Sequence, residues 1–154
     1  MTWSHQDSWE VDLVLHELIV LERQSERVNL EAGAVTHGIS FERERAIPGF
    51  HAAVAKRFDF SVMVDQGKFR KEFLIEIHGN QHYELSFLGD KVRESDRMKE
   101  QWARAYEIPL LVLRDQEVVR LHLDGKLGER IRKFLGASSS QPAAGRTKSR
   151  SKKR

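Results

Sequence analysis

The sequence predicts an α/β fold in which a mixed β-sheet, built around a hairpin, is flanked by helices. Two segments, 57–64 and 69–78, alternate apolar and polar side chains, which is the period of a strand with one face on a core. A charge-rich helical stretch at 90–106 and a short apolar run at 110–113 follow, and the order strand, helix, strand is typical of a parallel crossover. The length of 154 residues fits one domain with its own hydrophobic core.

Helices are the first elements expected along the chain. Asp7 and Glu10 resemble a capping box, and apolar residues recur at helical spacing through 8–24, which predicts an amphipathic helix. The apolar surface of this helix is wide, so a homodimer formed through it is a further prediction. A second helical stretch is expected at 25–35, followed by a short strand at 39–41.

The predicted hairpin has one apolar and one polar face. The turn residues at 65–68 separate its two strands. Glu76 and His78 lie on the polar face of the second strand, because side chains two residues apart on a strand point the same way. Asp59 lies on the polar side of the first strand, so antiparallel pairing is expected to bring it toward Glu76.

The C-terminal part divides into a folded end and a basic tail. Residues 117–123 are predicted to add a strand and 127–135 a final helix, so that one domain covers 1–136. Residues 137–154 are rich in Ser, Ala and basic residues, cannot bury a core, and are predicted to be disordered. The formal net charge of +3 is a property of this tail, which holds six basic residues and no acid, whereas the rest of the chain has 20 basic and 23 acidic residues.

Composition excludes several kinds of site. Cysteine is absent, so there are no disulfides or thiolate metal sites, and His, Asp and Glu remain as metal-binding side chains. His78 and His82 have the spacing of a helical zinc motif, but Gly79 and Asn80 between them argue against a helix.

No apolar run is long enough to cross a bilayer, and a cytoplasmic location is expected, either near the nucleoid or in the host of a phage.

Asp59 and Glu76 suggest a metal site at the end of the hairpin. Two carboxylates converging from adjacent strands form a hard oxygen site suited to magnesium or manganese. His78 and His82 could supply proton transfers, since imidazole titrates near neutral pH. The alternative is that both acids belong to the solvent-facing side of an amphipathic hairpin.

Four sequence blocks resemble the PD-(D/E)XK nuclease superfamily. The blocks are Arg57-Phe58-Asp59-Phe60, Leu74 to Tyr83, Asp96-Arg97-Met98-Lys99 and Ile108 to Arg114. They are similar to the branch that contains very-short-patch repair endonucleases and related phage and homing enzymes, and the resemblance spans about residues 25–115. It implies a restriction-endonuclease-like core and a metal-dependent DNA endonuclease that acts in repair, recombination or phage DNA metabolism.

The resemblance also implies a set of functional residues. The metal, Mg²⁺ or Mn²⁺, would be held by the two hairpin acids and the main-chain carbonyl of Ile77. The lysine position of the superfamily motif holds a histidine here, which leaves the general base open between two histidines. A further acid, from the Ser25-Glu26 or the Glu44 region, would contribute from outside the hairpin. The implied catalytic residues are Asp59, Glu76, His78, His82, Glu26 and Glu44.

Basic side chains are expected to bind nucleic acid. Lys99 could neutralise a phosphate or pair with Asp96, one helical turn away. The predicted nucleic-acid-binding residues are Lys99, Arg97, Arg146, Lys148, Arg150, Lys152, Lys153 and Arg154. Two alternatives to a DNA endonuclease remain open, a non-catalytic DNA-binding protein with a nuclease fold and an RNA-processing nuclease. Within the endonuclease class, branched DNA, junctions and nicking of ordinary duplex all remain open as substrates.

Overall fold

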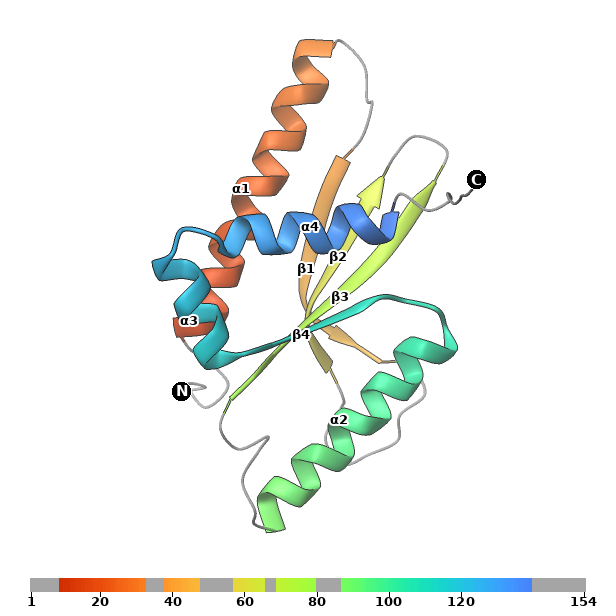
Figure 1. Ribbon diagram of the computed structural model, residues 1–154. Helices are drawn as coiled ribbons and strands as arrows, with labels where there is room; N and C mark the ends of the chain where they lie inside the picture. The colour runs from red at the N-terminus through yellow and green to blue at the C-terminus, as the bar shows by residue number, and fades with distance from the viewer. Residues whose placement is uncertain (1–8, 33–37, 48–56, 66–68, 80–86, 140–154) are drawn as a thin grey trace, which may run out of the picture.

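A four-stranded sheet with helices on both sides forms the part of the protein that the computed structural model describes, residues 9–32, 38–47, 57–65, 69–79 and 87–139. Figure 1 shows α2 on one side of the sheet and α1, α3 and α4 on the other. In chain order the elements are α1 (Trp9–Ala32), β1 (Gly38–Ala46), β2 (Arg57–Asp65), β3 (Arg70–His78), α2 (Phe87–Ala105), β4 (Leu110–Arg114), α3 (Asp115–Leu123) and α4 (Leu127–Ser139).

The sheet has the strand order β1-β2-β3-β4 and is mixed. Strands β1, β2 and β3 pair antiparallel, whereas β4 pairs parallel to β3. Since α2 connects β3 to β4, these three elements form the strand, helix and strand crossover that the sequence predicts. The predicted α/β class, with a mixed sheet flanked by helices, is confirmed.

The larger core lies between the sheet and helices α1, α3 and α4. The apolar alternation of the hairpin accounts for it, because every second side chain of β2 and β3 points to this face. Its fully buried residues from the sheet are Phe60, Val62, Phe73, Ile75 and Leu113. The helices contribute Val14, Leu18, Leu21, Val118, Leu127, Ile131 and Leu135.

A smaller apolar cluster lies under α2, on the opposite face of the sheet. It contains Phe58 and Leu74, both fully buried, together with Ala103 of α2. The regular alternation at 57–64 predicts that Phe58 faces the same core as Phe60, and this prediction is wrong, because Phe58 packs in the cluster under α2. Glu44 of β1, opposite this part of β2, has a left-handed φ of 53°, and the β1–β2 register is the same on both sides of it.

Helix α1 is continuous, although the sequence suggested two helical segments that divide near Ser25. The Ser25 side chain is buried within the helix, where its hydroxyl donates to the Glu22 carbonyl at 2.9 Å. The same oxygen accepts a hydrogen bond from the Ile39 N–H at 3.2 Å. Ser25 therefore joins α1 to the start of β1 instead of beginning a new helix.

The C-terminal part differs from the prediction in two places. Residues 117–123, expected as a strand, belong to helix α3. Val118 is buried and Leu121 packs against the same core, and this spacing of three residues suits a helix. Helix α4 runs to Ser139, past the predicted domain boundary at Gly136, and the basic residues of the tail lie outside the described residues.

Much of the apolar surface of α1 is used within the chain. Val14, Leu18 and Leu21 are buried in the larger core, and Leu13 and Leu15 pack at its edge. The homodimer through this helix therefore stays a prediction. In the described part of the chain, no helix has both the length and the apolar character needed to cross a bilayer.

We expect Leu74→Ala to lower the free energy of unfolding by about 2–5 kcal/mol, because it removes a fully buried side chain from the cluster under α2. Leu123→Ala is the matched control, since Leu123 is 74% exposed and its loss should change this free energy by less than about 0.5 kcal/mol. Urea denaturation measures both. Equal effects of the two substitutions would contradict the packing of α2 on this face.

Candidate functional site

Asp59 and Glu76 meet at the point where β2 and β3 stop pairing. The register between these strands runs from Asp65↔Arg70 to Phe60↔Ile75, so the two acids come directly after the last pair. The Asp59 N–H donates to Glu76 Oε1 at 2.9 Å, and the Ile77 N–H donates to Asp59 Oδ2 at 2.7 Å. Each carboxylate thus accepts a backbone hydrogen bond from the other strand, which fixes the position of both side chains.

Lys99 reaches this pair from α2. Its ammonium donates to Glu76 Oε2 and, at 2.9 Å, to the Arg57 carbonyl, and it lies 5.8 Å from the centre of the Phe58 ring. The side chains of Lys99 and Glu76 are both largely buried in this ion pair. Lys99 therefore pairs with a hairpin acid, and the pair with Asp96 considered from the sequence is not the one formed.

His78 and Asp96 lie next to this ion pair. His78 is 5% exposed, and its Nε2 is 3.7 Å from Asp96 Oδ1. Glu76, His78 and Asp96 can each offer one ligand atom, and these three atoms lie within 4.8 Å of one another. Sequence reasoning considered Asp96 only as a partner of Lys99 and missed its place in this cluster.

The spacing of residues on α2 and β3 explains the arrangement. Glu76 and His78 are two residues apart on a strand, about 6.6 Å, and Asp96 and Lys99 are three apart on a helix, about 4.5 Å. Both separations place side chains on one face, so α2 can offer one residue to each hairpin side chain. Strand β4 supports the other edge of β3 there, with Glu76 opposite Val112.

Burial and a neighbouring carboxylate make ionisation of Asp59 unfavourable. The pKa of Asp59 is raised from 3.8 to about 7, first by burial and then by the negative charge of Glu76. The hydrogen bond from the Ile77 N–H and the charge of Lys99 act in the opposite direction but do not outweigh these effects. Asp59 would ionise more readily if a further cation were bound nearby.

Two further predicted catalytic residues, Glu26 and Glu44, are exposed, and Glu44 lies on β1 opposite Asp59 in the register. Glu26 lies on α1, and the Glu44 carbonyl accepts a 3.3 Å hydrogen bond from Arg57. The hydrogen bonds that fix Asp59 and Glu76 involve neither of these glutamates. Ile77 contributes its N–H to the site, and a role for its carbonyl stays a prediction. His82 lies outside the described residues.

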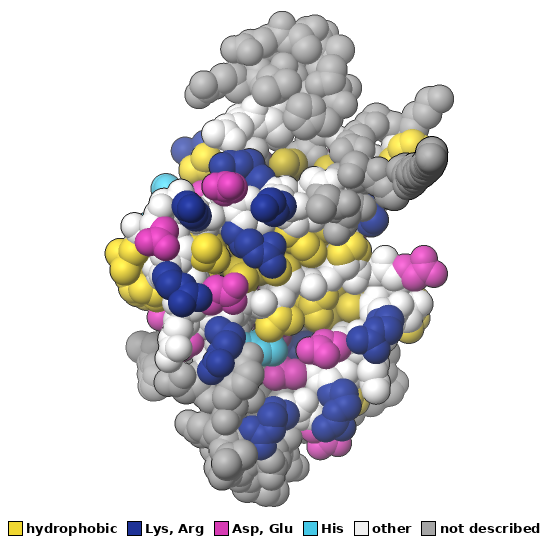
Figure 2. Space-filling model, in the orientation of Figure 1, with side chains coloured by type: hydrophobic (Ala, Val, Ile, Leu, Met, Phe, Trp, Pro, Cys, Tyr) yellow, Lys and Arg dark blue, Asp and Glu magenta, His cyan; other side chains and the backbone are white. Residues whose placement is uncertain are grey.

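Exposed basic side chains lie on the same elements as residues of the acidic cluster, which is defined as Asp59, Glu76, His78 and Asp96. Arg57 of β2 and Arg97 of α2 are exposed. Figure 2 shows Lys and Arg side chains on several sides of a histidine and acidic side chains in the lower half of the molecule. A negatively charged ligand could therefore approach the carboxylates between positive charges.

Glu72 belongs to a separate polar network on the α2 side of the sheet. Arg45 Nε donates to Glu72 Oε2 at 2.8 Å, the Ser61 hydroxyl donates to the same oxygen, and the Arg45 guanidinium lies 5.6 Å from the centre of the Trp102 ring. Burial opposes ionisation of Glu72, but the bonds from Arg45 and Ser61 outweigh it and hold its pKa below the usual value. This network joins β1, β2 and β3 and has a structural role.

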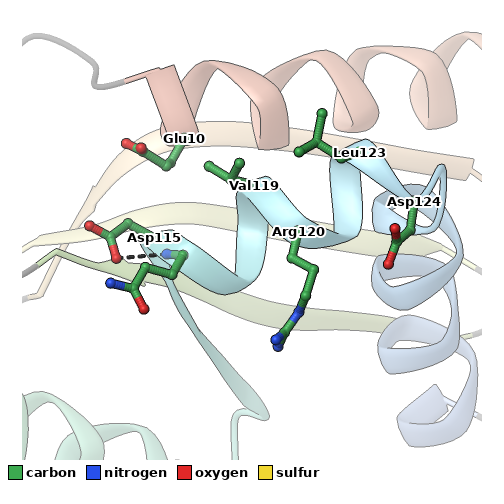
Figure 3. A pocket seen from close by; sticks show the side chains of 7 residues that line it. Glu10, Asp115, Val119, Arg120, Leu123 and Asp124 are labelled. Carbon is green, nitrogen blue, oxygen red and sulfur yellow. Dashed lines mark hydrogen bonds between the residues drawn. The ribbon is translucent and has the colours of Figure 1, made fainter.

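A cavity of about 390 Å³ lies between the start of α1 and α3, away from the acidic cluster. Its lining includes Glu10, Asp115, Arg120 and Leu123. Asp115 Oδ1 accepts the N–H of the next residue at 2.7 Å. Figure 3 shows Glu10 and Arg120 pointing away from each other, so the charged groups of this cavity do not converge on one ligand.

Comparisons of the chain with protein-family models, with curated proteins and with solved structures find no match.

The raised pKa of Asp59 predicts a pH-dependent stability. Between about pH 4 and pH 7 the folded chain keeps a proton on Asp59 that the unfolded chain has released, so the contribution of this group to stability falls as pH rises through that interval. Asp59→Asn keeps an oxygen acceptor for the Ile77 N–H but does not ionise. Urea denaturation at about pH 5 and about pH 8 should show the variant gaining stability relative to the unsubstituted protein at the higher pH. The same difference at both values would contradict the raised pKa.

Proposed function

We propose that the protein is a metal-dependent endonuclease that hydrolyses DNA phosphodiester bonds, and that it belongs to the PD-(D/E)XK superfamily. The observation that carries this proposal is the Asp59–Glu76 pair, which adjacent strands hold together through two backbone hydrogen bonds. Such a pair at the end of a hairpin matches the positions that the sequence resemblance implies for metal-binding acids. The parallel crossover through α2 also has the strand arrangement expected of this resemblance.

Mg²⁺ or Mn²⁺ fits the donor groups of this pair. Carboxylate oxygens are the ligands that these hard cations prefer, and a bound cation would favour the ionised form of Asp59, which burial and the charge of Glu76 oppose. Asp59 and Glu76 would hold the ion, with the carbonyl of Ile77 as the third predicted ligand. When bound, the ion supplies the Lewis acidity needed for attack of water at phosphorus.

Residues of the chain itself would orient the phosphate and move protons. Lys99 brings an ammonium group to Glu76 from α2, although the lysine position of the superfamily motif on β3 is occupied by His78. We expect Lys99 also to attract a nonbridging phosphate oxygen. His78, buried beside Asp96, or His82 would accept the proton of the attacking water.

DNA is the substrate class that we infer from the resemblance and from the distribution of charge. The folded part is acidic overall, and the six basic residues of the tail can bind backbone phosphates regardless of sequence. Arg97 is exposed and directly follows Asp96 in the sequence, and it would contact the phosphates of the DNA backbone. A junction or branched substrate would follow if the protein pairs through α1, because a dimer presents two sites. The proposed setting is DNA repair, recombination or phage DNA metabolism.

We expect Asp59→Asn and Glu76→Gln to reduce plasmid cleavage in Mg²⁺ or Mn²⁺ by about 100-fold or more, since each removes a charge that positions the metal. Both substitutions keep an oxygen that accepts the backbone N–H of the opposite strand, so the hairpin should stay intact. Gel analysis of supercoiled, nicked and linear plasmid measures the rates. A chelator should abolish cleavage by the unsubstituted protein.

Glu94→Gln and Asp124→Asn are the matched controls for these two variants. Both residues are exposed, and neither belongs to the acidic cluster. Both controls should cleave at the rate of the unsubstituted protein. Full cleavage by Asp59→Asn or Glu76→Gln would overturn the assignment of the site. DNA binding without cleavage, indifferent to Mg²⁺, would favour a non-catalytic DNA-binding protein, and cleavage of RNA alone would favour an RNA-processing nuclease.

The tail predicts a second measurable property, the salt dependence of DNA binding. A chain that ends at Ser139 keeps all of α4 and lacks the six basic residues beyond it. The slope of log K against log salt concentration should become shallower by up to about 5, because each phosphate contact contributes about 0.9. Fluorescence anisotropy with a labelled duplex measures this slope. Identical slopes for the full and shortened chains would rule out the tail as a DNA tether.

A further inference from the structure

We propose that Glu76, His78 and Asp96 form a binding site for a divalent first-row transition ion that accepts an imidazole ligand, with Zn²⁺ as the representative ion. This site shares Glu76 with the proposed Mg²⁺ site but has a different set of ligands. It would bind its ion whether or not the protein hydrolyses DNA.

The ligand atoms of the three side chains lie close enough together to share one ion. His78 Nε2 is 3.7 Å from Asp96 Oδ1. Ligands at about 2.0–2.1 Å in a tetrahedral zinc site lie about 3.4 Å from one another. Since the ligand atoms of the three residues lie within 4.8 Å of one another, small side-chain rotations would bring them to this geometry.

The fold holds these side chains in place before any ion binds. Glu76 and His78 come from β3, are each 5% exposed, and lie where β4 pairs with β3. Asp96 comes from α2, and its side chain is 12% exposed. Because two rigid elements supply the ligands and all three are largely withdrawn from water, binding an ion would require little ordering of the chain.

The chemistry of the ligands indicates which kind of ion this site would bind. An imidazole nitrogen suits zinc and its neighbours in the first transition row, whereas Mg²⁺ prefers oxygen ligands and keeps several waters. Glu76 and Asp96 would supply two carboxylate ligands to a divalent ion, and Lys99 would keep its hydrogen bond to Glu76 Oε2. Asp59 is not one of these three ligands, so it would stay available to bind Mg²⁺ in the proposed hydrolytic site.

Isothermal titration of the full chain with Zn²⁺, in the absence of DNA, tests the site. We expect His78→Asn and Asp96→Asn each to weaken one binding event by about 10-fold or more, as loss of a ligand requires. Asp59→Asn should keep that event, because Asp59 is not among the three ligands. His16→Asn, at an exposed histidine of α1, is the matched control and should also keep it. Titration with Mg²⁺ should not reveal this binding event.

A spectroscopic measurement on the unsubstituted protein tests the site without relying on the folding of any variant. With ¹⁵N-labelled histidine, Zn²⁺ should shift the ring-nitrogen resonances of His78 at a lower concentration than those of His16. Unchanged His78 resonances at saturating Zn²⁺, or equal binding by the His78→Asn variant, would overturn the proposal. So would loss of the event in Asp59→Asn. These readouts are independent of cleavage, so failure of the zinc site and failure of the nuclease proposal can be told apart.

Discussion

Backbone N–H groups at the point where β2 leaves β3 need acceptors, and the side chains of Asp59 and Glu76 supply them. These two hydrogen bonds hold the carboxyl groups of Asp59 and Glu76 close together in a largely buried position, where water screens their charges only weakly. The pKa of Asp59 is raised first by this burial and then by the neighbouring charge of Glu76. The polar groups at this end of the hairpin therefore have a structural role and a chemical consequence at the same time.

Helix α2 completes the arrangement because its residue spacing suits that of β3. Lys99 reaches Glu76 and Asp96 reaches His78, while Ala103 packs in the cluster of Phe58 and Leu74 below the helix. The apolar contacts of α2 thus hold its charged residues over the hairpin. Lys99 supplies an ammonium group to the Asp59–Glu76 pair, and a bound cation would add positive charge that favours ionised Asp59.

The sequence predicted the elements whose side-chain period is unambiguous. The hairpin, the strand at Leu110 and the crossover helix could be placed because alternation with period two and a short buried run differ clearly from helical spacing. Residues 117–123 were misassigned because apolar residues at closely spaced positions fit either period. Ser25 was misread because a buried serine can bond to its own helix and to a neighbouring strand.

The part of the site that lies within the hairpin was predictable from the alternation of its strands. Asp59 and Glu76 share one hairpin, so register alone brings them together, whereas the partners of Lys99 and Asp96 depend on how a helix packs against the sheet.

The proposal that a divalent cation completes the Asp59–Glu76 pair can be tested by ¹³C NMR titration of the Asp59 carboxyl group with and without Mg²⁺. The midpoint should lie near pH 7 without the ion and fall when Mg²⁺ is added at constant ionic strength. A midpoint that Mg²⁺ leaves unchanged would contradict the claim.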